Sequence, residues 1–378
     1  MERTPFGLRR GTRRGGKKAN NGEAGPGPQW PVFLCVDRPL IPFETPISLF
    51  HAVKKIKSLE VVEMKRFLSR MLAFCSLAFV LFVSQGVQAK TLLRFMKPTY
   101  KTSPPPIVLV AFGTSTKAQV TFDYIDQEVK KAFPGHEIRW AFTSSIIRKK
   151  MNRLYEKKGV KKRLKSLLQV LADLEAEGYR KVVVQSLHVF PGEEWVHILN
   201  QGEMEGLNIS FGEPIFATWE DVNRVLDALE QEIPAPREGC AVLAGHGSPN
   251  TYAAPSTAVY PALDRLLSSR FENCFLGSVE GIPSREDALN RAKAYPGKHV
   301  RIIPIMLVAG DHVMNDIMGE EPGDEGEPSW AVELRKAGKT VDAPTISIKG
   351  STYYKGLGFY PITVEIIKEH IKQALRDL

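Results

Sequence analysis

The segment 300–316, VRIIPIMLVAGDHVMND, constrains the fold of this chain more than any other stretch. It begins as an apolar run from Val300 to Val308, long enough for one buried strand, and breaks at Gly310. Asp311 and His312 follow on the predicted loop. An apolar strand that ends in glycine and a polar pair is typical of open α/β sheets, whose ligands bind beyond the carboxyl ends of parallel strands. A solvated strand end is the alternative interpretation of this segment taken alone.

Two further apolar runs end in the same way. Cys240–Ala244 leads into GHGS with His246, and Cys274–Gly277 leads into SVEG with Glu280. If these strands are parallel neighbours, His246, Glu280 and His312 lie at one edge of the sheet. Two imidazoles and one carboxylate are a common ligand set for a divalent first-row metal. The sequence therefore predicts a metal site at this edge.

Predicted strands and helices alternate from residue 107 onward, which indicates parallel βαβ units. The predicted strands cover residues 107–112, 137–142, 181–187, 213–216, 240–244, 274–278, 300–308 and 341–347. The predicted helices cover residues 118–132, 146–158, 161–177, 193–204, 219–231, 257–269, 284–294, 329–337 and 361–376, with a polar loop at 315–328.

The alternation divides into two similar halves. The linker Pro234-Ala235-Pro236 separates an N-terminal domain, 106–234, from a C-terminal domain, 235–378, which carries the predicted metal site. VLVAFGTS at 108–115 parallels AVLAGHGS at 241–248, and LHVFPGEE at 187–194 resembles IMLVAGDH at 305–312. We therefore predict an α/β fold of two similar Rossmann-like domains with parallel sheets and a cleft between them.

The formal charge of +9 is concentrated at the N-terminus. Residues 1–63 carry 11 Lys and Arg against 6 Asp and Glu, residues 64–89 carry 3 against 0, and residues 90–378 carry 37 against 36. The body is near neutral, so we expect no nucleic-acid partner. Residues 1–63 are rich in Gly, Pro and Arg, which predicts a disordered extension. We interpret it as an over-long translation start before Met64; a nucleic-acid arm and a twin-arginine signal fit less well.

Residues 64–89 have the pattern of a secretory signal peptide. A basic start at 65–70 precedes the 13-residue apolar run 71–83, and small residues at 87–89 precede Lys90. This run is shorter than the roughly 20 apolar residues of a membrane span; an uncleaved anchor is the alternative. We expect a periplasmic protein with a short tail, 90–105, before the first domain.

The cysteine pattern and the glycine-rich turns argue against several classes of protein and binding site. Cys240 and Cys274 each begin a predicted strand, and both a disulfide between neighbouring strands and two buried free thiols are open. The absence of a CxxC pattern argues against zinc ribbons and thioredoxin chemistry. GTST lacks the spacing of GxGxxG, and GHGS lacks both the lysine of a P-loop and the pattern of a nucleophile elbow. We therefore expect no nucleotide cofactor and no serine hydrolase.

Several segments together resemble the sirohydrochlorin cobaltochelatases of anaerobic cobalamin biosynthesis, class II chelatases related in fold to ferrochelatase. They are AFGTS (111–115), AFTSSIIRKK (141–150), VQSLHVFPGEE (184–194), GHG (245–247), SVEG (278–281), PIMLVAGDHVMND (304–316) and GLG (356–358). The resemblance covers about residues 105–378. It implies two chelatase-like domains and an enzyme that inserts Co²⁺, or alternatively Fe²⁺, into sirohydrochlorin without ATP. The secretory signal resembles the periplasmic variety.

The family's metal-binding residues, two histidines and a glutamate, carry over to His246, Glu280 and His312. Metal insertion displaces two pyrrole protons, and imidazole can accept them because it titrates near neutral pH. We expect His246 to accept protons, with Glu280 as the second catalytic residue, and Glu280 and His312 to present the metal. The glycines around His246 would let the backbone approach a flat macrocycle.

The tetrapyrrole substrate carries eight carboxylates, which predicts a locally basic cleft. Arg148, with its neighbours Lys149 and Lys150, is the candidate partner, although a basic helical face is commonly only solvated. We also assign substrate contacts to the turn Phe112, Gly113, Thr114 and Ser115.

His188 and the quaternary structure leave further alternatives. His188 is either a hydrogen-bonded histidine at a strand end or an axial haem or second metal ligand, and we expect a homo-oligomer. The competing function is an exported metal- or haem-binding or transport protein on a chelatase fold.

Overall fold

The computed structural model describes residues 69, 100–251, 256–321 and 326–378. The predicted extension 1–63, the signal peptide apart from Ser69, and residues 90–99 of the predicted tail lie outside the described residues. The described residues between 100 and 378 form one compact unit. Among the described residues, no helix combines the length and the apolar character needed to cross a membrane.

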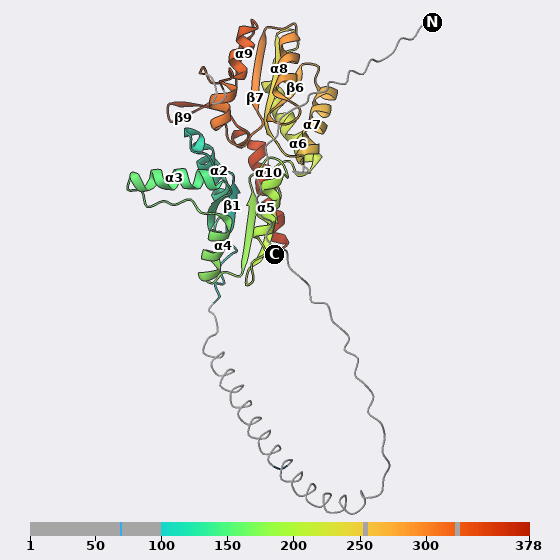
Figure 1. Ribbon diagram of the computed structural model, residues 1–378. Coiled ribbons are helices and arrows are strands. Elements are labelled where there is room, and N and C mark those ends of the chain that lie inside the picture. The colour runs from blue at the N-terminus through green and yellow to red at the C-terminus, as the bar shows by residue number, and fades with distance from the viewer. Residues whose placement is uncertain (1–68, 70–99, 252–255, 322–325) are drawn as a thin grey trace, which may run out of the picture. The chain divides into compact units, whose positions relative to one another are not determined.

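The first half of this unit is built on a four-stranded parallel sheet in the order β2-β1-β3-β4 (Figure 1). Its strands are β1 (Ile107–Ala111), β2 (Ile138–Phe142), β3 (Lys181–Ser186) and β4 (Asn208–Gly212). Its helices are η1 (Lys117–Gln119), α2 (Val120–Ala132), α3 (Ser145–Lys157), α4 (Leu167–Ala176), α5 (Glu193–Gln201), α6 (Trp219–Leu229) and η2 (Glu230–Glu232).

The second half repeats this topology with the order β6-β5-β7-β8, again all parallel. Its strands are β5 (Gly239–Gly247), β6 (Cys274–Glu280), β7 (His299–Pro304) and β8 (Thr340–Asp342), followed by an antiparallel hairpin of β9 (Thr345–Ile348) and β10 (Ser351–Tyr354). Its helices are α7 (Ser256–Arg270), α8 (Arg285–Ala294), the π-helix η3 (Val313–Ile317), α9 (Trp330–Lys336), η4 (Leu357–Phe359) and α10 (Pro361–Arg376). The matching strand orders confirm the predicted α/β fold of two similar halves with parallel sheets.

Both sheets are covered on both faces, which is why their strands read as continuous apolar runs. Successive strand residues point to opposite faces. One face of each sheet contributes to a core that runs through both halves, and it includes Leu109 and Leu243. The opposite faces belong to two separate clusters, one under α4 and α5 and one under α8 and α9. The shared cluster explains why the two halves form one compact unit.

The last helix crosses back to the first half. α10 packs against β3 and β4 and contacts α2 and α6, although its sequence follows the second sheet. Its apolar residues Ile366, Ile367 and Ile371 are fully buried. The sequence pattern establishes this helix but not the sheet that it covers.

Several predicted boundaries were wrong for local reasons. The fourth strand lies at 208–212 rather than 213–216, and the helix predicted from 161 begins at Leu167, where Ser166 and Gln169 form a capping box. The strand predicted for 341–347 is divided into β8 and β9. The hairpin that follows was not predicted; its turn places Lys349 and Gly350 at positive φ.

The strand predicted for 300–308 ends at Pro304, just before Ile305 N makes a last hydrogen bond to Ala244 O of β5 (2.9 Å). The chain from Met306 to Leu307 then pairs with the later segment GLG. Leu357 N donates to Met306 O (2.8 Å) and Gly358 N donates to Leu307 O (2.9 Å). A Cβ at Gly356 or Gly358 would crowd the carbonyl oxygen of Leu307. The glycines of GLG therefore hold the segment after β7 in place.

The two cysteines of the body are buried free thiols. Cys274 pairs in register with Ala241, so that Cys240 lies one residue away and on the opposite face of the sheet. This register prevents the disulfide that the sequence left open. Burial raises the pKa of the Cys240 thiol to about 11 and raises the pKa of Cys274 as well.

We predict that the protein spanning residues 90–378 contains two unreactive thiols. Folded protein should react far more slowly with a thiol reagent than protein in guanidinium, because both sulfurs are buried and protonated at neutral pH. Mass spectrometry after alkylation, with and without reduction, checks this. A mass gain that requires prior reduction would contradict the free-thiol assignment.

Candidate active site

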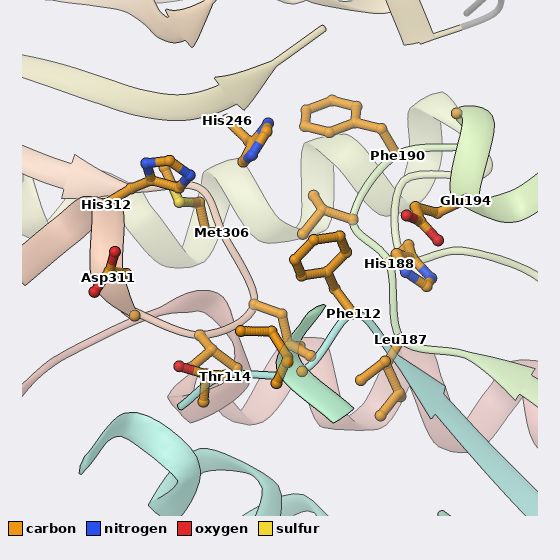
Figure 2. Close-up of a pocket in the computed structure, with 18 of the residues that line it drawn as sticks. Phe112, Thr114, Leu187, His188, Phe190, Glu194, His246, Met306, Asp311 and His312 are labelled. Atoms are coloured by element: carbon orange, nitrogen blue, oxygen red, sulfur yellow. The ribbon is translucent and has the colours of Figure 1, made fainter. Parts of the chain in front are cut away.

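A cavity of about 670 Å³ lies between the two halves at the carboxyl ends of their strands. Figure 2 shows the residues that line it converging from both halves. They are Ala111, Phe112, Gly113, Thr114, Ser115, Phe122, Ile146, Ile147, Lys150, Leu187, His188, Val189, Phe190, Gly192, Glu193, Glu194, His246, Gly247, Ser248, Pro249, Tyr260, Glu280, Ile305, Met306, Leu307, Val308, Gly310, Asp311 and His312. This size and this largely apolar lining with a few polar groups are typical of small-molecule sites.

The three predicted metal ligands all line this cavity. Gly247 pairs with Glu280 at the ends of β5 and β6, which places the His246 turn beside Glu280. The rings of His246 and His312 have centroids 4.9 Å apart and lie nearly perpendicular, at 81° (Figure 2). The structure therefore brings the two imidazoles together and puts the carboxylate on the same wall.

The side chains do not form a closed metal site in this conformation. Within the described part of the chain, no three His, Cys, Asp or Glu side chains are grouped closely enough to surround one ion. The two imidazoles are adjacent, so the geometry supports a pair of nitrogen ligands.

His312 is oriented by a carboxylate one helical turn later. The chain enters a helical turn at Asp311 and continues as the π-helix η3, in which Met318 N donates to Val313 O (3.0 Å). His312 Nδ1 lies 2.7 Å from Asp316 Oδ2. Since a carboxylate accepts, Nδ1 carries the hydrogen and Nε2 keeps its lone pair for a metal or proton. π-Turns of this kind occur frequently at functional sites.

His246 is oriented through the backbone around it. Its Nδ1 donates to Gly247 O (3.2 Å), which again leaves Nε2 free. The buried hydroxyl of Tyr260 accepts from Gly247 N (3.0 Å), and a Cβ at Gly245 would lie 2.7 Å from the Tyr260 ring. Gly247 has φ +83°, and a Cβ there would overlap the carbonyl oxygen of Glu280. Packing within the protein therefore already requires these glycines; their expected approach to a macrocycle stays a prediction.

The first half supplies the opposite wall of the cavity. Phe112, Gly113, Thr114 and Ser115 line it as the sequence predicted, and Phe112 is 48% exposed. Gly113 adopts φ +105°, so the turn after β1 depends on glycine.

Arg148 does not belong to the cavity wall. Its guanidinium donates to the carbonyl oxygens of Phe142 and Thr143 (2.7 Å to the latter) at the end of β2, and burial lowers its pKa. Its role in the structure is to bind backbone carbonyls. Lys150, two residues later on α3, is the basic side chain of this helix that lines the cavity.

His188 lines the cavity as a half-buried ring with one unpaired nitrogen. Its Nδ1 lies 3.1 Å from Ser186 Oγ, whereas Nε2 is buried and finds no hydrogen-bond partner among the residues that the structure describes. Burial lowers the pKa of His188 to about 4, so the imidazole is neutral at neutral pH. A neutral imidazole is the form that binds metals.

Sequence reasoning missed three groups at this site. Asp316 was assigned to a polar loop, although its i, i+4 spacing from His312 signals the contact once that loop is helical. Tyr260 comes from α7 and has no local signal in the sequence. Glu193 and Glu194 at the start of α5 were placed on a helix without a role.

Comparisons with known proteins support one family. The family model described as cobalt chelatase (CbiK) matches residues 106–376. The sirohydrochlorin cobaltochelatase of Salmonella typhimurium is 27% identical over 275 residues, covering 71% of this chain and 96% of that protein. The sirohydrochlorin cobaltochelatase CbiKC of Nitratidesulfovibrio vulgaris is 29% identical over 280 residues, covering 72% and 91%.

Among solved structures, SirB from Bacillus subtilis with Fe³⁺ has a TM-score of 0.48 at 15% identity, covering 72% of this chain and 96% of that one. The sirohydrochlorin chelatase SirB in complex with cobalt, from Bacillus subtilis subspecies spizizenii, has a TM-score of 0.45 at 14% identity, covering 72% and 96%. The family model spans nearly all of the two-half unit, from β1 to the end of α10. This chain belongs to the cobalt chelatase (CbiK) family.

Proposed function

We propose that this protein is a metal chelatase that inserts Co²⁺ into sirohydrochlorin and releases two protons. The observation that carries the proposal is the pair of imidazoles at the cavity wall. His246 and His312 are each anchored through Nδ1, and their Nε2 lone pairs are left for chemistry. The two relatives named sirohydrochlorin cobaltochelatase support the identity of metal and macrocycle.

His246 is the group best suited to take the pyrrole protons. Metal insertion breaks two pyrrole N–H bonds, forms bonds from the pyrrole nitrogens to the metal and transfers both protons to bases. Imidazole titrates near neutral pH and can accept and release protons in turn. His246 is exposed, so each proton can pass to water before the next transfer.

His312 and Glu280 are the groups best suited to present the metal. The Asp316 carboxylate accepts a hydrogen bond from His312 Nδ1 and fixes the ring, as carboxylates commonly do for metal-binding histidines. Glu280 adds a negative charge on the same wall. Because Co²⁺ is a substrate and must leave, an open set of ligands suits the reaction better than a closed cage. The apolar residues opposite, among them Phe112 and Phe190, provide a surface for the flat macrocycle.

Two alternatives are separated by one assay. Fe²⁺ is the alternative substrate metal, and an exported metal- or haem-binding or transport protein is the alternative function. Absorbance spectra of metal-free sirohydrochlorin incubated with residues 90–378 and each divalent metal distinguish them. Turnover well above the uncatalysed rate supports the enzyme and ranks the metals, whereas stoichiometric binding without turnover supports the binding protein.

We predict distinct losses for the three proposed ligands. His246→Ala should lower kcat for insertion about 10²- to 10⁴-fold at every pH, because the proton acceptor is gone, while Co²⁺ still binds. His312→Ala should lose insertion without unfolding, since the ring leaves no core cavity behind. Glu280→Gln should weaken Co²⁺ binding most, because it removes the charge and keeps the shape.

Calorimetric Co²⁺ titration, insertion kinetics and thermal melting check these outcomes. His197→Ala and Glu286→Gln are matched controls, because both side chains are exposed and neither lines the cavity. If His246→Ala keeps most activity and Glu280→Gln keeps full Co²⁺ affinity, the division of roles is wrong.

His188 is a second candidate ligand, and we propose that it can hold a haem iron. Its buried Nε2 without a described partner and its neutral ring suit a nitrogen ligand that would hold the iron. A bound haem would supply a redox-active iron. We predict that haemin added to the wild-type protein gives the red-shifted Soret band of a histidine-ligated haem, that His188→Ala loses it and that His197→Ala keeps it. The same spectrum from His188→Ala would contradict this ligation.

We also propose that the protein forms a homo-oligomer. The adjacent helices α4 and α5 expose the apolar side chains Leu168, Val196 and Leu199. Apolar residues that recur on one surface favour contact with another chain.

We further propose export to the periplasm, based on the signal-peptide pattern of 64–89. We predict that N-terminal sequencing of the native protein from a periplasmic fraction gives Lys90 as the first residue, because signal peptidase cleaves after small residues. Native protein that retains residues before Met64 would refute the proposed export.

A further inference from the structure

The strongest concentration of charge in the body is a basic arm, which we define as residues 148–165. It comprises α3 from Arg148 onward and the connection to α4, and it carries 10 Lys and Arg against 1 Glu. The rest of 90–378 carries 27 Lys and Arg against 35 Asp and Glu. The near-neutral body is therefore the sum of an arm of net +9 and a remainder of net −8.

Eight of these cations are exposed and take part in no ion pair with any residue that the structure describes. They are Lys149, Lys150, Arg153, Lys157, Lys158, Lys161, Lys162 and Arg163. The two others are engaged, since Arg148 binds backbone carbonyls and Lys165 pairs with Asp173. Like charges so close together repel one another, and the repulsion is relieved by a multivalent anion.

The arm begins at the cavity wall. Ile146, Ile147 and Lys150, on the first turns of α3, line the cavity. Figure 1 shows α3 and its following connection extending away from the body of the first half. The 13 residues of α3 reach about 20 Å at 1.5 Å per residue. The arm therefore runs from the cavity wall outward.

The cavity itself is poor in basic groups. Among its described lining residues, Lys150 is the only Lys or Arg, while Glu193, Glu194, Glu280 and Asp311 all contribute carboxylates. These carboxylates favour the binding of a cation. They oppose the approach of an anion, so a polyanionic partner needs attraction from outside the cavity.

We propose that the basic arm is an electrostatic capture surface that draws a polycarboxylate tetrapyrrole to the cavity. The inference rests on the proposed function, which supplies a substrate with eight carboxylates. The arm's cations engage peripheral carboxylates while the macrocycle settles against the apolar wall. Charges of one sign beside a cleft raise association rates 10- to 1000-fold and do so less as salt increases.

An anionic membrane fits this surface less well. Interfacial helices bury a continuous apolar face, whereas the apolar residues of α3 are few and are separated by its cations. Met151 is buried, and Ile146 and Ile147 line the cavity. Ile146 is 74% exposed at the cavity, Leu154 is 37% exposed on α3, and Val160 is 45% exposed beyond the end of the helix. These scattered side chains do not form a continuous apolar face.

The test neutralises the distal part of the arm. The arm variant combines Lys157→Gln, Lys158→Gln, Lys161→Gln and Lys162→Gln, positions that are exposed and do not line the cavity. The matched control combines substitutions of four exposed lysines elsewhere that form no ion pair within the described part of the chain, Lys131→Gln, Lys298→Gln, Lys336→Gln and Lys372→Gln. The probes are uroporphyrin, which has eight carboxylates, and mesoporphyrin, which has two. Stopped-flow fluorescence measures the rate at which each probe binds at low and at high ionic strength.

The arm variant should bind uroporphyrin about tenfold more slowly than wild type at low salt, with the difference vanishing at high salt. The control variant should bind uroporphyrin at a rate within about twofold of the wild-type rate. Mesoporphyrin should bind to the arm variant and to the control variant at nearly the same rate. In the insertion assay the arm variant should lose kcat/KM and keep kcat. If the wild type does not insert Co²⁺, the proposed function is wrong. The capture proposal is tested separately, by the rate of uroporphyrin binding.

Three outcomes would overturn the proposal. One is an unchanged uroporphyrin rate, or an equal loss in the control. Another is arm-dependent sedimentation with phosphatidylglycerol vesicles without any change in uroporphyrin binding, which identifies a membrane surface. The third is a slower rate that accompanies an altered oligomeric mass in sedimentation velocity, which identifies an arm that joins subunits.

Discussion

Parallel pairing of β5 between β6 and β7 is the constraint on which the rest of the site depends. Because parallel strands end at the same edge, the turns that carry His246 and Glu280 emerge side by side, and the chain after β7 returns to them with His312. The spacing between the β5 and β6 turns is so small that Gly247 and Gly281, both at positive φ, face the carbonyl oxygens of Glu280 and Ser248. A side chain at either glycine would push the two turns apart and move the imidazole or the carboxylate with them. The positions of the proposed ligands are therefore set by backbone packing before any metal arrives.

The segment after β7 shows how the fold converts a strand end into a functional loop. β7 ends at Pro304, Ile305 N still bonds to β5, and GLG at 356–358 then pairs with Met306 and Leu307. The chain is thereby held against the start of α10, which itself packs on the first sheet. His312 reaches the cavity from a loop that both halves of the molecule support. The π-turn then adds Asp316 as an internal anchor for the ring.

The sequence predicted the topology and the three cavity residues for one physical reason. Fully buried parallel strands are continuous apolar runs, and a polar residue after such a run must lie at the sheet edge. What it could not predict depends on contacts distant in sequence. Nothing local indicates that α10 covers the first sheet or that Tyr260 binds Gly247 N. Arg148 was assigned to substrate from its charge alone, whereas the geometry of α3 aims it at the end of β2. The i, i+4 spacing of His312 and Asp316 was visible, but it carries information only if the segment is helical.

The two halves have the same topology and different chemistry, and the difference lies in the residues after equivalent strands. After β5 the chain places an imidazole between glycines; after β1 it places Phe112, a glycine and two hydroxyl residues. The first half thus offers a mainly apolar and hydrogen-bonding surface, with His188, Glu193 and Glu194 at its side, and the second offers the paired imidazoles with Glu280 and Asp311. Phe190 of the first half packs against Tyr260 of the second, with ring centroids 4.3 Å apart, so the two surfaces are joined directly at the cavity. A duplicated fold has in this way separated two tasks that conflict electrostatically. The carboxylates that favour a divalent cation repel a polyanionic macrocycle, and the cations that attract the macrocycle lie outside the cavity, on the arm of the half that holds none of the three proposed cobalt ligands. One cavity can then receive two oppositely charged substrates.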